Sequence, residues 1–474
     1  MTSWYSRFLF ERSLALMYLV AFAVTANQFV PLLGERGLLP VSRFTQFVPF
    51  RSSPSLFFLS PTDTTFRIAA WTGVALAVLA LSAWPQQRGT IASAIVWGAL
   101  WLLYLSFVNV GQTFYGFGWE TLLLEAGFLA IFLGGSATAP SIWLVWMYRW
   151  VLFRLMFGAG LIKLRGDACW RNLTCLNYYF ETQPIPNPLS WYFHWLPEWI
   201  HKAGVAINHF VELIVPFGLL APQPIAGIAG LITIGFQGVL IVSGNLSWLN
   251  WLTLILCIPA LDDRFLSWLP VTPPALHEQE LIHRGAIYAL AIAVGFLSIA
   301  PARNMLSSSQ LMNTSFEPLH VVNTYGAFGS VTRTRYEIVI EGTGDAALTE
   351  QTRWREYEFK GKPGDPARRP PQIAPYHLRL DWLMWFEAFS PEPADDWFPA
   401  LLERMLRGDA ATLALLKTNP FPDRPPHYLR ARYYRYWFTT PAERRQSGRW
   451  WNRQLVSEFV RPITLSVFEG PWNQ

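Results

Sequence analysis

LALMYLVAFAVTANQFVPLL, residues 14–33, is a run of 20 residues without a charged side chain. A helix needs about 20 such residues to cross the apolar core of a bilayer, and the run is longer than the core of a signal peptide. Arg7, Glu11 and Arg12 precede it. We therefore expect a first membrane helix that stays in the mature chain.

Further apolar runs follow as far as residue 300. They lie near residues 66–84, 91–110, 119–133, 142–164, 205–220, 225–242, 248–261 and 286–300. Several are short, and turns rich in Pro or Gly separate them, so two adjacent runs could be re-entrant. The pattern predicts a polytopic α-helical membrane protein with about nine helices.

The composition changes near residue 300. Only 28 of the first 300 residues are charged, against 41 of the last 174, and the second fraction is close to the roughly 25% of ordinary globular chains. We therefore expect a helical membrane domain over residues 1–300 and an extramembrane domain over residues 301–474. Membrane lipid is one expected partner, whereas the absence of a long basic run argues against a nucleic-acid partner.

The C-terminal part carries strand and helix patterns. Residues 335–342, 353–361 and 427–438 alternate in the way of strands, and residues 395–417 have the pattern of a helix. These patterns predict an α+β or β-rich domain.

The sidedness of the membrane part follows from its loops. The count of Lys and Arg in short loops does not decide the orientation. Arg88, Arg264 and Arg284 lie in brief polar turns, whereas the loops near 34–66 and 164–204 are long and aromatic. With the N-terminus inside and an odd number of helices, these two loops and residues 301–474 lie outside the cytoplasm. That would be the periplasm for a bacterial inner-membrane protein and the lumen for an endoplasmic-reticulum protein.

Ionisable residues within apolar runs are costly and mark either pairing or function. The set is Glu120, Glu125, Arg154, Lys163, His209 and Glu212. One interpretation is an intramembrane polar network in which Arg154 and Lys163 neutralise glutamates at position 120, 125 or 212. Because Lys163 and Asp167 are four residues apart, and His209 and Glu212 three, each pair could share a helix face.

The other interpretation is a reactive Lys or His in a membrane-facing cavity. Its catalytic candidates are Lys163, Asp167, His209 and Glu212. The sequence has no nucleophile elbow, P-loop or dinucleotide fingerprint. His194, His201 and His209 lack the spacing of metal ligands, so we expect neither a metal nor another cofactor.

Three cysteines are too few for a disulfide scaffold. Cys169 and Cys175 lie on the expected outer loop, where they could form a disulfide or remain two small buried thiols. Cys257 lies inside an apolar run and is expected to be a buried thiol.

The strand HYLRARYYRYWF, residues 427–438, offers candidates for partner contact. Arg and Tyr are favoured anchors in interfaces, so Arg430, Arg432, Tyr434 and Arg435 are the side chains that we single out. The alternative is a Tyr-rich strand pair with no partner. If these side chains serve a partner, replacing the outward-facing Arg430, Arg432 or Arg435 should leave thermal stability nearly intact, whereas unfolding of the domain by each replacement would show structural side chains.

Long blocks of the chain resemble the lipase maturation factor family. They are FGWETLLLEAGFLAIFL (117–133), WVLFRLMFGAGLIKLRGDACWRNLTCLNYYFETQPIPNPLSWYFH (150–194), NHFVELIVP (208–216), NTYGAFGSVTRTRYEIVIEG (323–342), WREYEFKGKPGD (354–365) and APYHLRLDWLMWFEAF (374–389). The resemblance implies a membrane folding factor for a secreted lipase or another hydrolase, with its C-terminal domain on the lumenal or periplasmic side. The compact length suggests a bacterial member.

One short block is also distantly similar to vitamin K-dependent gamma-glutamyl carboxylases. Lys163, Asp167 and Trp170 match their pattern of a Lys near an outer helix end, then an acidic residue and a Trp. This similarity implies an alternative, a membrane enzyme that uses a Lys base on a lipid-like or quinol-like substrate. A transporter is a third hypothesis, but it would need an internal repeat that the sequence does not show.

Overall fold

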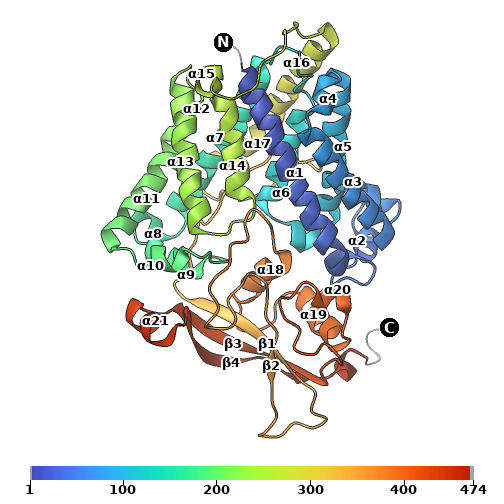
Figure 1. Ribbon diagram of the computed structural model, residues 1–474, viewed down its shortest axis with the longest axis vertical. Helices are drawn as coiled ribbons and strands as arrows, with labels where there is room; N and C mark the ends of the chain where they lie inside the picture. Colours follow the sequence, from blue (N-terminus) through green and yellow to red (C-terminus); the bar gives the residue numbers. More distant parts are fainter. Residues whose placement is uncertain (1–2, 470–474) are drawn as a thin grey trace.

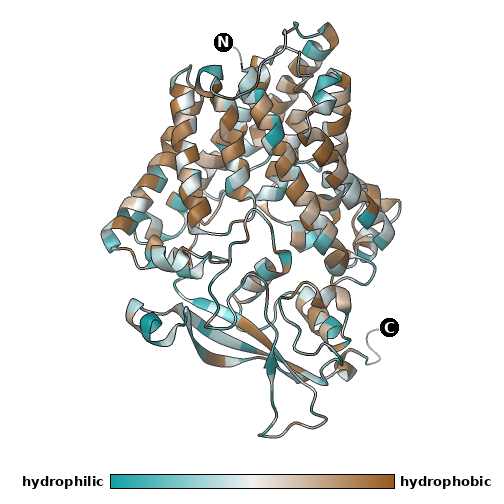
Figure 2. Cartoon of the chain, viewed as in Figure 1, coloured by the Kyte–Doolittle hydropathy of each residue, from teal (hydrophilic) through white to brown (hydrophobic). Residues whose placement is uncertain are grey.

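The computed structural model describes residues 3–469, as a helical bundle with a smaller domain at one end (Figure 1). The long helices are α1 (Trp4–Leu33), α3 (Asp63–Leu81), α5 (Thr90–Val110), α6 (Gly118–Ala130), α7 (Ile142–Arg165), α11 (Glu198–Leu213), α12 (Val215–Leu219), α13 (Ile225–Ser243), α14 (Leu249–Cys257), α16 (Leu281–Leu297) and α17 (Ile299–Leu306). Shorter elements of this part are α2 (Val41–Phe47), η1 (Phe50–Ser52), η2 (Leu56–Phe58), α4 (Trp84–Gln87), η3 (Gln112–Tyr115), α8 (Ala168–Arg171), α9 (Leu176–Thr182), α10 (Ser190–His194), η4 (Ile258–Ala260) and α15 (Asp263–Leu266). Apolar residues dominate the bundle, and polar residues are more frequent in the smaller domain (Figure 2).

The prediction of a polytopic helical membrane protein is confirmed. Within residues 3–469, seven helical segments are long and apolar enough to cross a membrane. The two other expected spans are shorter, because α6 has 13 residues and α14 has nine. At 1.5 Å per residue, neither helix alone covers the ~30 Å of an apolar bilayer core.

Contacts at the two ends of the short helix α6 relate the first turns of α1 to the smaller domain. Beyond the C-terminus of α6, the carbonyl oxygens of Leu133, Ser136 and Thr138 accept hydrogen bonds from the Arg7 guanidinium in the first turns of α1. At its N-terminus, α6 begins with Gly118, which lies directly against Asn313 of the smaller domain. The N-terminus and residues 307–469 therefore lie at opposite ends of the bundle (Figure 1).

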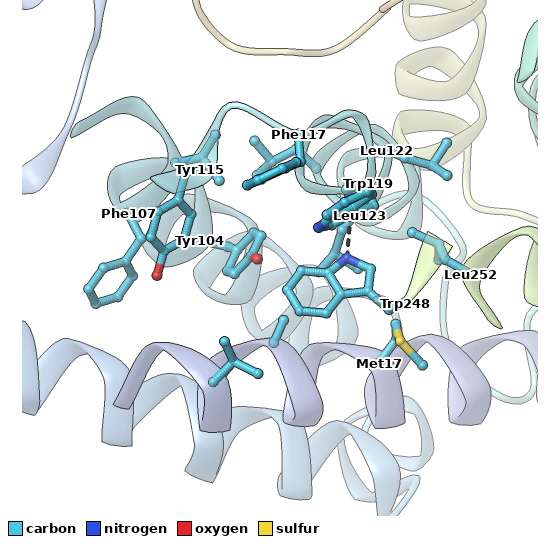
Figure 3. Close-up of a cluster of buried hydrophobic side chains, with 14 of the residues drawn as sticks. Met17, Tyr104, Phe107, Tyr115, Phe117, Trp119, Leu122, Leu123, Trp248 and Leu252 are labelled. Atoms are coloured by element: carbon cyan, nitrogen blue, oxygen red, sulfur yellow. Dashed lines mark hydrogen bonds between the residues drawn. The ribbon is translucent and has the colours of Figure 1, made fainter. Parts of the chain in front are cut away.

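Aromatic side chains fill the bundle beside the start of α6. Tyr104, Phe107 and Tyr115 pack toward α1, and the Trp248 indole donates to the Trp119 carbonyl at 3.1 Å (Figure 3). Trp248 is fully buried. This packing holds the first turns of α6 and α14 together, even though both helices start well inside the bundle.

The smaller domain, residues 307–469, contains a four-stranded antiparallel sheet with helices on one face. Its elements are β1 (Arg335–Thr343), β2 (Arg355–Glu356), α18 (Arg379–Glu387), α19 (Trp397–Leu406), α20 (Ala410–Leu413), β3 (Tyr428–Phe438), α21 (Pro441–Ser447), β4 (Trp451–Ile463) and η5 (Leu465–Phe468). The strand order is β2-β1-β3-β4. On one face of the sheet, Ile338 and Leu429 pack with α18 and α19 in one core. On the other face, Val339 and Tyr436 pack with Trp191 of α10.

Two of the predicted elements of this domain differ from the structure. The expected strand over residues 353–361 shrinks to the two residues of β2. Beyond Tyr357 the backbone leaves β1: the Glu358 carbonyl accepts from the N–H groups of Lys417 and Thr418, and the Gly361 N–H donates to the Asp381 carboxylate. The expected helix over residues 395–417 is divided into α19 and α20. Gly408 ends α19 with a φ of +66°, a conformation that favours glycine.

The sequence analysis did not predict β4 or α18. Strand β4 is an edge strand whose outward face mixes polar and apolar residues, which blurs the alternation. Helix α18 is buried along most of its length, so its sequence lacks an amphipathic period.

The smaller domain is fastened to the bundle by buried polar contacts. The Arg335 guanidinium donates to the carbonyl oxygens of Glu181, Gln183 and Pro184. From α1, the Gln28 amide donates to the His377 carbonyl at 2.6 Å and accepts from the Arg379 N–H at 3.0 Å. The two parts therefore form one continuous unit.

Candidate functional site

A cavity of about 840 Å³ lies between the bundle and the smaller domain. It occupies the space that the late starts of α6 and α14 leave free, and residues near Trp119 and Leu249 form part of its wall. Exposed residues such as Thr113, Met312 and Phe386 lie at its rim. A mostly apolar cavity of this size is typical of a small-molecule site.

One wall of the cavity carries a buried ion pair. Lys163, in the last turn of α7, places Nζ 2.5 Å from Glu212 Oε1 on α11. The same ammonium donates to Asn208 Oδ1 at 3.2 Å, and the Asn208 amide donates to the second Glu212 oxygen at 2.9 Å. Lys163 Nζ also lies 5.0 Å from the centre of the Trp170 ring. The predicted neutralisation of Lys163 by an intramembrane glutamate is thus present in the structure.

Asp167 does not pair with Lys163, contrary to the spacing argument. Helix α7 ends at Arg165, so Asp167 lies beyond the helix and does not share its face with Lys163. The Asp167 carboxylate instead accepts two hydrogen bonds from Arg333, at 2.6 and 2.7 Å. This contact holds the pKa of the Asp167 carboxyl below its usual range.

Glu120 also has a different partner from the one expected. Neither Arg154 nor Lys163 reaches it; Arg379 of the smaller domain donates to Glu120 Oε1 at 2.8 Å. The Tyr104 hydroxyl donates to the other oxygen of the carboxylate. Burial lowers the pKa of the nearby His377 to about 4, so at pH 7 this ring is neutral and the positive charge comes from Arg379.

Glu125 forms the second half of the predicted network. Its carboxylate is paired with the Arg154 guanidinium, and both side chains are about 1% exposed. The Tyr325 hydroxyl donates to Glu125 at 2.6 Å, and the Asn323 backbone N–H donates at 3.1 Å. Glu120 and Glu125 therefore belong to separate clusters, and each cluster ties α6 to residues after 307.

The histidine candidates do not converge on Glu212. His209 Nε2 contacts the Trp170 carbonyl at 3.0 Å, whereas Glu212 faces Lys163. His201 contacts Asn177 and the Phe193 carbonyl. Within residues 3–469, no group of three or more His, Cys, Asp or Glu side chains is arranged to hold a metal ion.

The structure decides between a disulfide and two buried thiols for Cys169 and Cys175. Cys169 and Cys175 are joined in a disulfide that closes the turn around α8. Both residues pack with Trp170, so the bridge lies directly behind the ring that faces Lys163. Cys257 is a free, buried thiol.

The structure changes the view of the partner candidates on β3. Tyr434 is only 8% exposed, so it cannot anchor a partner. Arg430 is half-buried, pairs with Glu341 at 2.6 Å and lies 3.9 Å from the centre of the Trp354 ring. Arg432 is half-buried beside the same glutamate, and of the three arginines only Arg435 is exposed.

Sequence reasoning missed the residues from the smaller domain that complete these clusters. Arg333, Arg379 and Asn323 lie far along the chain from their respective partners, Asp167, Glu120 and Glu125. A signal was present for Arg379, since it follows His377 and precedes Asp381 within a largely apolar segment. Charges in such a segment need partners, but the sequence cannot show which ones.

Known families match both parts of the chain. The family model described as "Lipase maturation factor transmembrane domain" matches residues 5–268, and "Lipase maturation factor C-terminal domain" matches residues 321–461. The chain belongs to the lipase maturation factor family. The matched ranges contain both partners of the Glu120–Arg379 contact and both partners of the Lys163–Glu212 pair.

Lipase maturation factors of animals align with nearly the whole chain. Lipase maturation factor 1 from Bos taurus is 43% identical, over 99% of this chain and 91% of the bovine protein. The human lipase maturation factor 1 is 42% identical over 98% of this chain and 88% of its own length. Lipase maturation factor 2 from Mus musculus is 29% identical, over 96% of this chain and 83% of the mouse protein. No solved structure matches the chain.

These relatives of the lipase maturation factor family bear on the choice between a folding factor and an enzyme. Their names describe maturation factors and not enzymes. Together with the helices long enough to cross a membrane, they identify the chain as an integral membrane protein of the maturation-factor type. The interpretation of Lys163 as a catalytic base is not favoured.

Proposed function

We propose that the chain is a membrane maturation factor for a secreted lipase and acts on its client through the domain of residues 307–469. The observation that carries the proposal is the 43% identity to bovine lipase maturation factor 1 along both parts of the chain. The buried Arg335 and Arg379 contacts hold this domain against the bundle.

We further propose that residues 307–469 lie outside the cytoplasm, in the periplasm of a bacterium or the endoplasmic-reticulum lumen of a eukaryote. Two observations support this. The Cys169–Cys175 disulfide lies at the same end of the bundle as this domain, and disulfides persist in oxidising compartments. The short turn with Arg88 lies at the other end, where Gln86 accepts from the Ser136 N–H.

Reporter fusions test the sidedness. Alkaline phosphatase fused after residue 474 should be active, because the enzyme needs an oxidising compartment to form its disulfides. The same reporter inserted after residue 88, in the turn at the opposite end, should be inactive and serves as the control. Activity at position 88 and none at position 474 would show that the orientation is reversed.

Client maturation is tested in a strain that lacks the gene. We expect each dependent lipase to be secreted with its specific activity reduced by about tenfold or more, and to recover when the wild-type chain is restored. Unchanged specific activity of every secreted lipase would contradict the proposal. Fluorescence of a tagged chain confirms that the restored chain, and each variant tested below, is present in the membrane in equal amounts.

Arg435, the exposed arginine of β3, gives the sharpest variant for the same assay. Arg435 is exposed and stacks only loosely on Trp437, with its guanidinium 5.5 Å from the ring centre. Arg435→Ala should leave the melting temperature unchanged but reduce lipase maturation if this strand contacts the client. Arg445→Ala on α21, also an exposed arginine, is the matched control. Equal maturation by both variants would remove Arg435 from the client surface.

A further inference from the structure

We propose that the cavity between the bundle and the smaller domain binds an uncharged amphiphile with a single hydrocarbon chain, of the monoacylglycerol type. The inference concerns a bound lipid and does not depend on the identity of the lipase client. Four features of the cavity support it: its size, its charge balance, its unpaired polar atoms and its access route.

The size and lining of the cavity suit one chain of a lipid. Its volume of about 840 Å³ lies within the range of about 300–1,000 Å³ that drug-sized ligands occupy. The cavity extends from the exposed rim at Met312 and Phe386 to Met156 on α7 and Thr253 on α14, deep in the bundle. Most of its lining is apolar, so a ligand that fills it must be largely hydrocarbon.

The charge balance of the cavity favours an uncharged head group. Lys163 and Glu212 neutralise each other, and Asn208 bridges the pair. Asp395, the remaining carboxylate of the lining, lies at the solvent-exposed rim. An anionic head group would have to displace Glu212 from Lys163 and leave a carboxylate unpaired in the interior, which is costly. A fatty acid anion is therefore a poorer ligand than its uncharged glycerol ester.

The lining also contains polar atoms that lack partners. Gln237 on α13 is 3% exposed, and among the described residues its amide oxygen has no hydrogen-bond partner. Its nitrogen makes only a 3.6 Å contact with the Met156 sulfur. The Trp119 indole N–H is likewise buried and unpaired within residues 3–469. Because buried polar groups are normally satisfied, an acceptor and a donor of this kind suit a head group with hydroxyl and ester groups.

An apolar path connects the membrane surface with the rim. Leu306 ends the last long helix and is 83% exposed. Leu311 and Met312 follow it and are also exposed, and Met312 itself lines the cavity. A lipid at the membrane surface could thus reach the rim along these side chains, without the entry of its chain into water.

Equilibrium binding to the purified full-length chain in detergent tests this inference. Labelled 1-monooleoylglycerol should bind saturably with one molecule per chain, and oleate should compete at least tenfold more weakly. Lack of saturable binding, or an equal or tighter affinity for oleate, would overturn the proposal.

Two variants locate the bound lipid. Ser330→Trp places a large ring on an exposed residue of the rim and should weaken binding by more than tenfold. Gln237→Leu removes the unpaired amide at nearly constant volume and should weaken binding by about three- to tenfold. Ser457→Trp, on an exposed serine of β4 away from the cavity and from the access path, is the matched control and should bind as the wild type does. Wild-type affinity in both Ser330→Trp and Gln237→Leu would place the lipid on the outer surface of the bundle instead and refute the cavity site.

Discussion

Arg379→Ala should lower the free energy of unfolding by about 3–5 kcal/mol. The substitution leaves the Glu120 carboxylate, which is 0% exposed, without a positive partner. It also removes a hydrogen bond of 2.6 Å to the Phe114 carbonyl and a contact of 3.4 Å with the Tyr115 ring. Burial is the largest cause of the low pKa of the neighbouring His377, and it disfavours a positive charge on this ring in the variant as well.

Thermal unfolding of the purified chain in detergent measures the effect. Adding Glu120→Gln to Arg379→Ala should recover part of the loss, because the unpaired charge is then gone. Arg424→Ala, an exposed arginine of the same domain, is the matched control and should change stability by less than about 0.5 kcal/mol. A melting temperature of Arg379→Ala equal to that of Arg424→Ala would show that the contact does not hold the two parts together.

Lys163→Ala should be about as destabilising, again by about 3–5 kcal/mol, because it leaves Glu212 unpaired in the wall of the cavity. Sequence spacing suggests Asp167 as the compensating site. The structure moves that role to Glu212, since Asp167 is held by Arg333. The double variant Lys163→Ala/Glu212→Ala should therefore recover part of the stability, whereas Lys163→Ala/Asp167→Ala should be no more stable than Lys163→Ala.

This double-mutant comparison also separates a structural lysine from a catalytic one. A Lys163→Ala chain of full stability that no longer supports lipase maturation would favour a chemical role for the ammonium. Loss of stability with partial rescue at Glu212 supports the ion pair as a structural element. Lipase activity and melting temperature should be measured on the same preparations.

Several parts of the fold followed from local sequence patterns. Within residues 3–469, the apolar runs located the seven helical segments that are long enough to cross a membrane, because a bilayer demands runs of a fixed length. The runs near 119–133 and 248–261 contain the shorter helices α6 and α14. The alternating segments located β1 and β3, which have one face on a helix-covered core. Edge strand β4 and the buried helix α18 have no such periodicity, so they escaped prediction.

For the candidate site, the sequence identified the charged residues but not their pairing. Glu125 with Arg154 and Lys163 with Glu212 were among the expected combinations, because few charges exist in the bundle and each needs a partner. The partners of Glu120 and Asp167 come from residues after 307 and lie more than 150 positions away. Helical spacing says nothing about contacts across such distances.

The sequence by itself determined the membrane character, the change to a polar domain after residue 300 and the set of buried charges. These properties depend on composition and on local periods of 2 and 3.6 residues, which can be counted along the chain. Only the tertiary structure decided which charges pair, which arginine of β3 is exposed, and that a cavity exists. The cavity arises because α6 and α14 begin inside the bundle while residues 312–332 and α18 close over the space. Such a space depends on how elements from both halves of the chain pack together, and no single segment encodes it.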